Sequence, residues 1–471
     1  MTASQVSAPS GALAGISRRR FLLPLALAQF ICSFAGSNMN VMINDISEDL
    51  DTTVKGVQTA ITLFLLIMAI LMIPASKLTE RWGRKRCFLG GLILYGIGAL
   101  LSAVSPGLGV LILGNSVFEG VGTAFLIPPV YILATIAFDD LTARARAFGV
   151  ISGLGGIGAA AGPLIGGLIT TAISWRAAFV FQALVVAAIV VLSRQLVDPI
   201  PADPTRPFDA VGAILSAVGM FFLVFGIQQA GSHNVLLTVF VILGAAFLVA
   251  FFVWIRARER AGKEALLPMR LFKNRISNLG LATQNAQWLI LMGSSFVVSV
   301  FLQEVRGYNA IQTGAIFTAA TLGILASSLG AERFATRRSQ KTLIVVGFLV
   351  TLAGIGLLLG LVHSSSNVVA FVPGLFFIGL GVGVMLTPSV NIVQSSFPEE
   401  DQGEISGLSR SVSNLGSSFG TAIVGTILVA ELGSGNAPYV AAMIVLGGVA
   451  VIGLAAALFL PSRLARVPAS G

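Results

Sequence analysis

Apolar segments of about twenty residues follow one another through almost the whole chain, and they constrain its fold more than any other feature. Of the 471 residues, 55% are hydrophobic and 10% are charged, whereas about a quarter are charged in ordinary soluble domains. A soluble fold could not cover this much apolar surface, so we expect the chain to lie in a lipid bilayer, where the backbone forms helices or a closed barrel. The segments are too long and continuous for barrel strands. The sequence therefore predicts an all-α membrane protein.

The apolar segments predict fourteen transmembrane helices, each long enough to cross the hydrocarbon core. An even number of spans places both termini on one side of the membrane. We expect the spans at residues 21–43, 57–78, 87–105, 109–137, 145–172, 177–196, 209–230, 235–256, 277–304, 310–331, 341–362, 367–395, 403–430 and 437–460.

The basic residues predict which side carries the termini, because Lys and Arg concentrate in cytoplasmic loops. Of the 29 Lys and Arg residues, 25 lie in the tails, or in or at the edges of loops that follow even-numbered spans. Lys55, Arg176 and Arg306 lie in the opposite loops, and Arg410 lies within a span. We therefore expect a multi-pass protein of the cytoplasmic (inner) membrane of a prokaryote, with both termini cytoplasmic. The net charge of +9 follows from this bias and predicts no nucleic-acid partner.

A weak internal repeat divides the chain into two halves. IPPVYI at 127–132 resembles TPSVNI at 387–392, and a pair of acids follows each, at 139–140 and 399–400. Duplicated bundles with a substrate site between them are typical of secondary transporters. We expect a cytoplasmic N-tail at 1–20, a six-helix bundle at 21–196, a linker with a two-helix insert and a basic cytoplasmic loop at 197–275, a second six-helix bundle at 276–460 and a C-tail at 461–471.

Two short motifs predict conformational elements. In GAAAGPLIGG, at 158–167, small residues at four-residue spacing form a stripe that a neighbouring helix can approach closely, and the proline should bend its helix. In SKLTERWGRKR, at 76–86, a glycine permits a tight turn, and an acid can pair with a neighbouring arginine or a helix N-terminus and so latch two helices together. The residues concerned are Gly158, Gly162, Pro163, Gly166 and Gly167 in the first motif and Glu80, Arg81, Gly83 and Arg84 in the second.

These two motifs resemble signatures of the major facilitator superfamily. GAAAGPLIGG is similar to the family's antiporter motif in its fifth helix. SKLTERWGRKR is similar to the family's loop between helices two and three, with Ser76 in place of a glycine and Glu80 in place of an aspartate. The fourteen spans narrow the resemblance to the drug–proton antiporter branch, which has two extra central helices. The resemblance implies proton-coupled export of hydrophobic or amphipathic small molecules, of the multidrug-efflux type, by alternating access.

The chain departs from that branch at two charged positions, because Ala35 stands where the branch has an aspartate and Ser116 where it has an arginine. These departures leave open an exporter of lipids or lipophilic metabolites with the same fold. A passive channel or a non-transporting membrane sensor is the alternative from another class. A channel would need a continuous polar stripe or charged rings, and the sequence shows scattered polar residues instead.

Glu119 is the lone acid inside the predicted span 109–137. Burying a carboxylate in a membrane is costly, so intramembrane acids usually have a function. We expect Glu119 to face a water-filled central cavity, where it would couple proton movement to conformation or bind a substrate charge, because desolvation lets a carboxyl exchange protons near neutral pH. The alternative is a carboxyl that hydrogen-bonds a neighbouring helix and serves packing alone.

Arg410 is a basic residue within the predicted span 403–430, away from its ends. It shares a helical face with Ser406, Ser413 and Ser417, so that face should line a cavity or another helix. Arg410 could hold an anionic substrate group, exchange partners with Glu119 or Glu404, or extend toward the cytoplasm from a packing face.

Several other polar residues are candidates for the transport route. Asp45, with the acids after it, forms either an acidic mouth that attracts protons or cations or a solvated loop. Other residues within spans either line a substrate-binding cavity or form interhelical hydrogen bonds. These are Asn38, Asn40, Gln284, Asn285, Gln287 and Trp288.

The sequence shows no enzyme motif. His233 and His363 have no ligand spacing around them, and no phosphate-binding loop of the type GxxxxGK[ST] is present. We therefore expect a monomeric transporter that is not an enzyme, holds no metal or cofactor and is driven by the proton motive force.

Overall fold

The computed structural model describes residues 18–138, 141–198, 201–230, 234–335, 338–364, 367–398, 401–430 and 436–461. These residues form α1 (Arg18–Asn38), η1 (Met39–Met42), α2 (Ile43–Asp49), α3 (Val54–Trp82), α4 (Arg84–Ala103), α5 (Leu108–Leu111), η2 (Ile112–Glu119), α6 (Gly120–Ala137), α7 (Leu141–Ala172), α8 (Trp175–Leu192), η3 (Ser193–Gln195), α9 (Ala210–Ile227), α10 (Asn234–Arg260), α11 (Arg270–Lys273), α12 (Arg275–Val300), η4 (Phe301–Val305), α13 (Ala310–Ala335), α14 (Gln340–Ser364), η5 (Val368–Ala370), α15 (Phe371–Gln394), α16 (Gln402–Ala430) and α17 (Ala437–Leu458).

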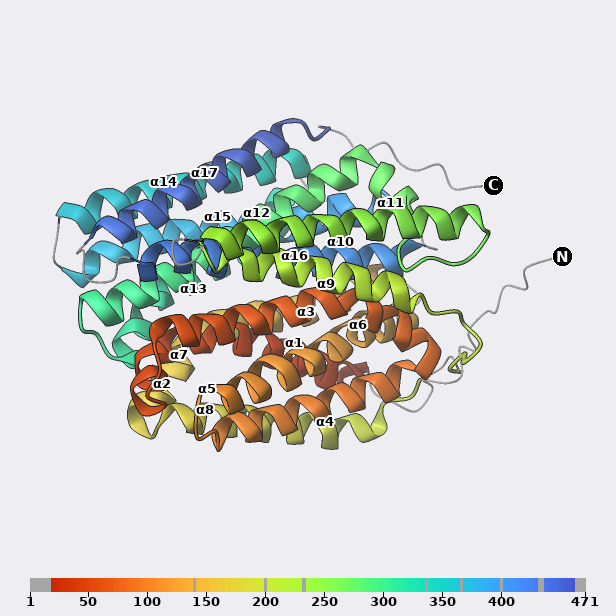
Figure 1. The fold of residues 1–471 in the computed structure, drawn as a ribbon, viewed down its shortest axis with the longest axis horizontal. Helices are drawn as coiled ribbons and strands as arrows, with labels where there is room; N and C mark the ends of the chain where they lie inside the picture. Colours follow the sequence, from red (N-terminus) through yellow and green to blue (C-terminus); the bar gives the residue numbers. More distant parts are fainter. Residues whose placement is uncertain are drawn as a thin grey trace.

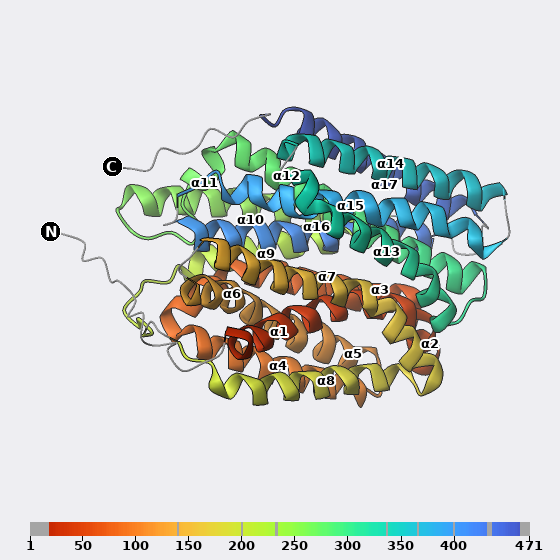
Figure 2. The same cartoon turned by 180° about the vertical axis from the view of Figure 1, so that it is seen from behind.

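The long helices run side by side in two groups (Figures 1 and 2). The helices α1 to α8 form the N-terminal bundle, and α12 to α17 form the C-terminal bundle, with α9 and α10 beside both. We call the end of the molecule that carries Lys77, Arg206, Arg258 and Arg270 the basic end. The other end, where α1 leads through η1 into α2, is the opposite end.

Each of the fourteen predicted spans coincides with a helix. Among the described residues, twelve helices are long and apolar enough to cross a membrane, or thirteen if the segments Gly149–Ala159 and Ala161–Ala172 of α7 form one span. These two segments meet at 41°, as expected from Pro163, which leaves the carbonyl of Ala159 without its helical partner. The remaining predicted span is α16, whose serine-rich sequence is less apolar. The structure thus establishes a multi-span helical protein, and the count of fourteen stays a prediction.

The glycine stripe of α7 packs against α1, as the sequence predicted. A Cβ atom at Gly158 would lie 2.3 Å from the carbonyl oxygen of Phe30, and one at Gly162 would lie 2.0 Å from Ser37 Oγ. Neither distance is compatible with a side chain, so the stripe lets the two backbones touch. Gly167, at the end of the motif, instead faces Ala310 of α13, with its carbonyl oxygen 2.4 Å from the position of a Cβ. The motif therefore also joins the two bundles.

Small residues on two faces of α16 allow it to pack tightly against α3 and α12 together. On one face, Ser411 donates to the Ala69 carbonyl of α3 at 2.6 Å, and Ser418 donates to the Thr62 carbonyl at 3.1 Å. On the other face, a Cβ at Gly416 would lie 2.4 Å from the Asn285 carbonyl oxygen of α12. The serines satisfy their hydroxyls on neighbouring backbone, which explains how so polar a sequence is buried.

The insert lies against the seam between the bundles. Val224 of α9 is fully buried together with Leu66 of α3 and Ala422 of α16. At the end of α9, the Ile227 carbonyl accepts a hydrogen bond from Thr426 at 3.5 Å. Since α3 belongs to one bundle and α16 to the other, α9 covers their junction.

Candidate transport interface

Arg410 joins the two bundles inside the molecule. Its Nη2 donates a hydrogen bond to the hydroxyl of Tyr131 in α6, and its guanidinium carbon lies 4.8 Å from the centre of the Tyr131 ring. The Tyr131 hydroxyl in turn donates to Gln29 Oε1 of α1 at 3.3 Å, and Gln29 Nε2 donates to Ser33 at 3.2 Å. Arg410 therefore does not extend away from a packing face. It contacts neither Glu119 nor Glu404 through any described hydrogen bond or ion pair.

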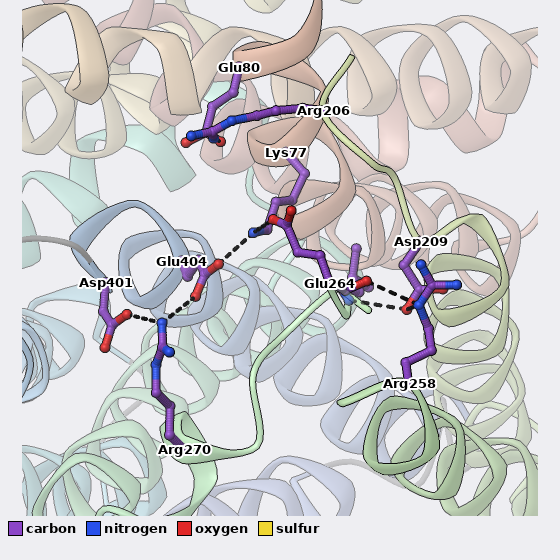
Figure 3. Close-up of polar contacts among 10 residues, drawn as sticks. Lys77, Glu80, Arg206, Asp209, Arg258, Glu264, Arg270, Asp401 and Glu404 are labelled. Atoms are coloured by element: carbon purple, nitrogen blue, oxygen red, sulfur yellow. Dashed lines mark hydrogen bonds and ion pairs between the residues drawn. The ribbon is translucent and has the colours of Figure 1, made fainter. Parts of the chain in front are cut away.

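At the basic end, charged residues connect both bundles to the insert (Figure 3). Lys77 of α3 forms ion pairs with Glu404 of α16 at 2.5 Å and with Glu264, between α10 and α11, at 3.1 Å. Arg270 of α11 pairs with Asp401 and lies 3.9 Å from Glu404. The hydrogen bond to Asp401 raises the pKa of Arg270 above its ordinary value, so this cation keeps its charge.

The predicted loop motif has the expected turn but an unexpected partner. Gly83 adopts a φ of +94° between α3 and α4, a conformation that favours glycine. Glu80 pairs with Arg206 of the linker that leads to the insert, rather than with a bundle helix. Asp198, in the same linker, accepts a hydrogen bond from the backbone N–H of Arg84 at 2.7 Å and so caps the start of α4. Arg81 is half-buried at the end of α3.

At the opposite end, Gln303 of η4 fastens the C-terminal bundle to the N-terminal one. Its Nε2 donates to the Asn40 carbonyl at 3.0 Å, and its Oε1 accepts from the backbone N–H of Asn44 at 3.2 Å. The Asn40 side chain also donates to Ser295 of α12 at 3.0 Å. Gln303 is not among the candidates predicted from the sequence, because a glutamine near the end of an apolar span carries no motif.

Glu119 does not face a water-filled cavity in this conformation, so that expectation was wrong. Its side chain is fully buried within the N-terminal bundle, and neither carboxyl oxygen has a hydrogen-bond partner among the described residues. The hydroxyls of Tyr95 and Ser102, both in α4, lie beside it without hydrogen-bond geometry. The reason is close packing: a Cβ at Gly98 of α4 would lie 2.8 Å from the Glu119 backbone nitrogen.

Glu119 ends the η2 segment, which is a π-helix interrupting an otherwise α-helical span. Such π-segments occur frequently at functional sites, because the extra residue per turn loosens the backbone ladder. No residue pattern in the sequence indicates this irregularity. Glu119 thus combines an unpaired buried carboxyl with a locally altered helix.

The polar residues of α12 mainly hold the C-terminal bundle together. Gln284 accepts from Ser409 of α16 at 2.8 Å, Gln287 bonds Val382 and Ser389 of α15, and Asn285 donates to the Val412 carbonyl at 2.9 Å. Gln284 and Gln287 are almost completely buried. In this conformation they form interhelical hydrogen bonds and do not line a cavity. Asn285 and Trp288 are half-buried.

The remaining candidates lie at the opposite end of α1. Asn38 is fully buried, and neither polar atom of its side chain has a hydrogen-bond partner among the described residues. Asp45 is half-buried in α2, so it is part of a helix and not of the solvated loop considered above. Several parts of the chain lie outside the described residues. They are the acid pairs at 139–140 and 399–400, the tails at 1–17 and 462–471, and the side chains of His233 and His363.

Comparison with known proteins identifies the family. The model of the Major Facilitator Superfamily matches residues 25–272, 208–421 and 285–470. The chain is 27% identical over 421 residues to "Multidrug resistance protein Stp" of Mycobacterium tuberculosis (strain CDC 1551 / Oshkosh), covering 89% of this chain and 77% of that protein. It is 28% identical over 431 residues to "Puromycin resistance protein pur8" of Streptomyces alboniger, covering 90% and 85%.

Two further similarities agree with this result. "Multidrug efflux pump LfrA" of Mycolicibacterium smegmatis is 27% identical over 410 residues, covering 87% of this chain and 80% of that protein. The crystal structure of a peptide transporter POT in complex with sulfate has a TM-score of 0.69 and 17% identity, covering 95% of this chain and 96% of that one, which is evidence for a shared fold. Because the family model covers almost all of the sequence, the chain belongs to the major facilitator superfamily of membrane transporters.

Proposed function

We propose that the chain is a proton-coupled exporter of hydrophobic or amphipathic small molecules that works by alternating access. The relatives named for multidrug resistance, puromycin resistance and multidrug efflux support export. The observation that carries alternating access is the nature of the contacts between the bundles. Lys77–Glu404 at one end and Gln303–Asn40 at the other are small polar contacts, which can open in turn while each bundle stays intact.

In this proposal the chain crosses the inner membrane fourteen times, with both termini cytoplasmic and α16 as a true span. The basic end then faces the cytoplasm, in keeping with the positive-inside rule. The driving force is the proton motive force, and the transporter is a monomer without a cofactor. An exporter of lipids or lipophilic metabolites is the second candidate, favoured by the neutral residues Ala35 and Ser116 at positions that are charged in related drug antiporters.

Glu119 is the proposed proton-coupling residue. An ionised carboxylate at its place would have no described counter-ion or hydrogen bond to offset its burial. Release of its proton therefore requires a rearrangement that admits water or a cation, which would link the charge of Glu119 to the conformation of α4 and α6.

Transport of N-phenyl-1-naphthylamine into proteoliposomes under an imposed pH gradient tests this function. The dye becomes fluorescent in apolar surroundings. Proteoliposomes that contain the protein in the inside-out orientation should accumulate the dye only while the pH gradient lasts. Equal movement with and without the gradient would contradict proton coupling. Movement that equals that of protein-free liposomes would contradict export of such molecules. A flux of small ions through the same vesicles would support the channel alternative.

A further inference from the structure

Arg410 differs in the partner it contacts from the cations that form ion pairs among the described residues. Lys77, Arg270 and Arg206 each pair with a carboxylate, and so do Arg176 and Arg258. Arg410 forms no ion pair with any described carboxylate and instead contacts the neutral phenol of Tyr131. A phenol offsets the burial of a cation less than a carboxylate does, so the positive charge between the bundles is incompletely compensated.

Arg410 lies far from the end of its helix, where an incompletely compensated charge is unusual. It lies eight residues inside α16 (Gln402–Ala430), which is about 12 Å along the helix axis at 1.5 Å per residue. Its contact Tyr131 belongs to α6 of the other bundle. A cation at such depth between two bundles is expensive unless it faces water or an anion. A cation retained at this position despite its cost is a candidate for a functional group.

The guanidinium of Arg410 is also accessible. It has five N–H donors, and the Tyr131 hydroxyl is the acceptor that the described residues provide. Arg410 is half-buried, yet none of its nitrogen atoms is among the buried atoms without a partner. The nitrogen atoms that Tyr131 does not contact therefore keep some exposed surface. A planar fork of this kind can bind a carboxylate, sulfonate or phosphate through two parallel hydrogen bonds.

We propose that Arg410 and Tyr131 form an anion-recognition subsite of the transport route, so that the preferred cargo is an amphipathic molecule with an anionic oxygen group. This inference rests on the proposed export function and specifies its substrate class. Tyr131 holds the guanidinium in place before the anion arrives, and its ring offers a flat apolar surface to the rest of the molecule. The anion then takes the place of the phenol oxygen and links α16 to α6 through the substrate.

The anionic group could belong to a soluble amphiphile or to the headgroup of an anionic phospholipid. Both would place the same oxygen atoms on the guanidinium. A binding experiment in nanodiscs of phosphatidylcholine, with or without phosphatidylglycerol, separates these sources. Competition by phosphatidylglycerol in the wild type but not in Arg410→Gln would assign the subsite to a lipid headgroup. Binding of a soluble anion that is independent of phosphatidylglycerol would assign it to a soluble amphiphile.

The test compares two fluorescent probes that share a ring system and differ by one charged group. They are 8-anilinonaphthalene-1-sulfonate, which is anionic, and N-phenyl-1-naphthylamine, which is neutral. Their dissociation constants would be measured for the full-length protein in phosphatidylcholine nanodiscs. Arg410→Gln should weaken binding of the sulfonate at least tenfold, or about 1.4 kcal/mol, and leave binding of the neutral probe unchanged. Arg410→Lys should retain part of the sulfonate affinity, and Tyr131→Phe should keep or increase it.

Arg306→Gln is the matched control, because Arg306 also lies over an aromatic ring, 5.4 Å from the centre of Phe301, but at the opposite end of the C-terminal bundle. It should not alter the affinity for either probe. Binding of the neutral probe to Arg410→Gln verifies that this variant is folded. Two results would contradict the subsite. One is a wild type that does not bind the sulfonate more tightly than the neutral probe, and the other is an Arg410→Gln variant that keeps the wild-type affinity for the sulfonate. Because binding is measured without a gradient, that result is independent of the transport experiment that tests export.

Discussion

Lys77 and Glu404 form an ion pair of 2.5 Å between α3 of the N-terminal bundle and α16 of the C-terminal bundle. The two residues are 327 positions apart in the sequence. Their side chains are 14% and 20% exposed, so water screens the pair only in part. At the other end, Gln303 and Asn40 join the same two bundles through a neutral hydrogen bond. The ends therefore differ in the chemistry that holds them closed, and they can be perturbed separately.

Replacing Glu404 by Gln should open the basic end. The substitution keeps the shape of the side chain but removes the charge that Lys77 and Arg270 contact. We expect a shift of about 1 kcal/mol, or roughly a fivefold change in population, toward the conformation with that end open. Distances between spin labels on the basic ends of α3 and α16 would measure it. High salt should produce a smaller shift of the same sign in the wild type, and an unaltered distance distribution in the variant would contradict the latch.

Replacing Gln303 by Ala should shift the equilibrium in the opposite direction. The substitution removes both hydrogen bonds that the amide makes to the backbone of residues 40 and 44, and each is worth about 1 kcal/mol. The same spin-label pair should then report a more closed basic end, and labels across the opposite end should move apart. Since no ion pair is involved, salt should have little influence on this variant. A shift in the same direction as Glu404→Gln would refute the two-ended arrangement.

Replacing Gly158 by Ala should destabilise the N-terminal bundle. The new Cβ would lie 2.3 Å from the Phe30 carbonyl oxygen, and a backbone atom cannot move aside as a side chain can. We expect a loss of about 1–3 kcal/mol, which is typical of overpacking, measured by thermal unfolding in detergent. Gly156→Ala is the control on the same helix, because no atom lies within 4 Å of its Cβ position. Equal effects of the two substitutions would show that the stripe does not depend on close contact with α1.

Replacing Glu119 by Gln should separate coupling from folding. Gln has nearly the shape of the protonated acid, and the carboxyl makes no described hydrogen bond that would be lost, so stability should change by less than about 1 kcal/mol. Transport driven by a pH gradient should stop, whereas movement down a substrate gradient should continue. Glu304→Gln provides the control, since Glu304 is an exposed carboxyl of η4. If the Glu119→Gln variant transports normally under a pH gradient, Glu119 has no role in proton coupling.

The positions of the helices could be predicted because apolar segment length is a local property of the sequence. The bend at Pro163, the turn at Gly83 and the close approach at Gly158 were also predictable, since each follows from the covalent structure of one residue type. The same local reasoning could not find the π-helix before Glu119 or recognise that α1 continues through η1 and α2 to Asp49.

Partners across the bundles could not be predicted, because they depend on the packing of helices far apart in the sequence. The sequence marked Arg410 as a buried cation but did not pair it with Tyr131. For Glu119, it showed an acid within an apolar segment, which is compatible with either a cavity or a closed packing site. The packing of α4 decides between them, because Gly98 lets that helix approach the backbone of the acid closely and the Glu119 side chain is fully buried.

The position of α9 against α3 and α16 has a consequence for the path by which molecules reach the interior from the membrane. Fatty or aromatic compounds dissolved among the acyl chains could in principle slip sideways between two bundles. On the side of α3 and α16 the insert helix α9 covers this seam, and its Val224 is buried against both helices. Under the proposed export function, lateral entry from the lipid would then be confined to the other side of the molecule, where α7 meets α13.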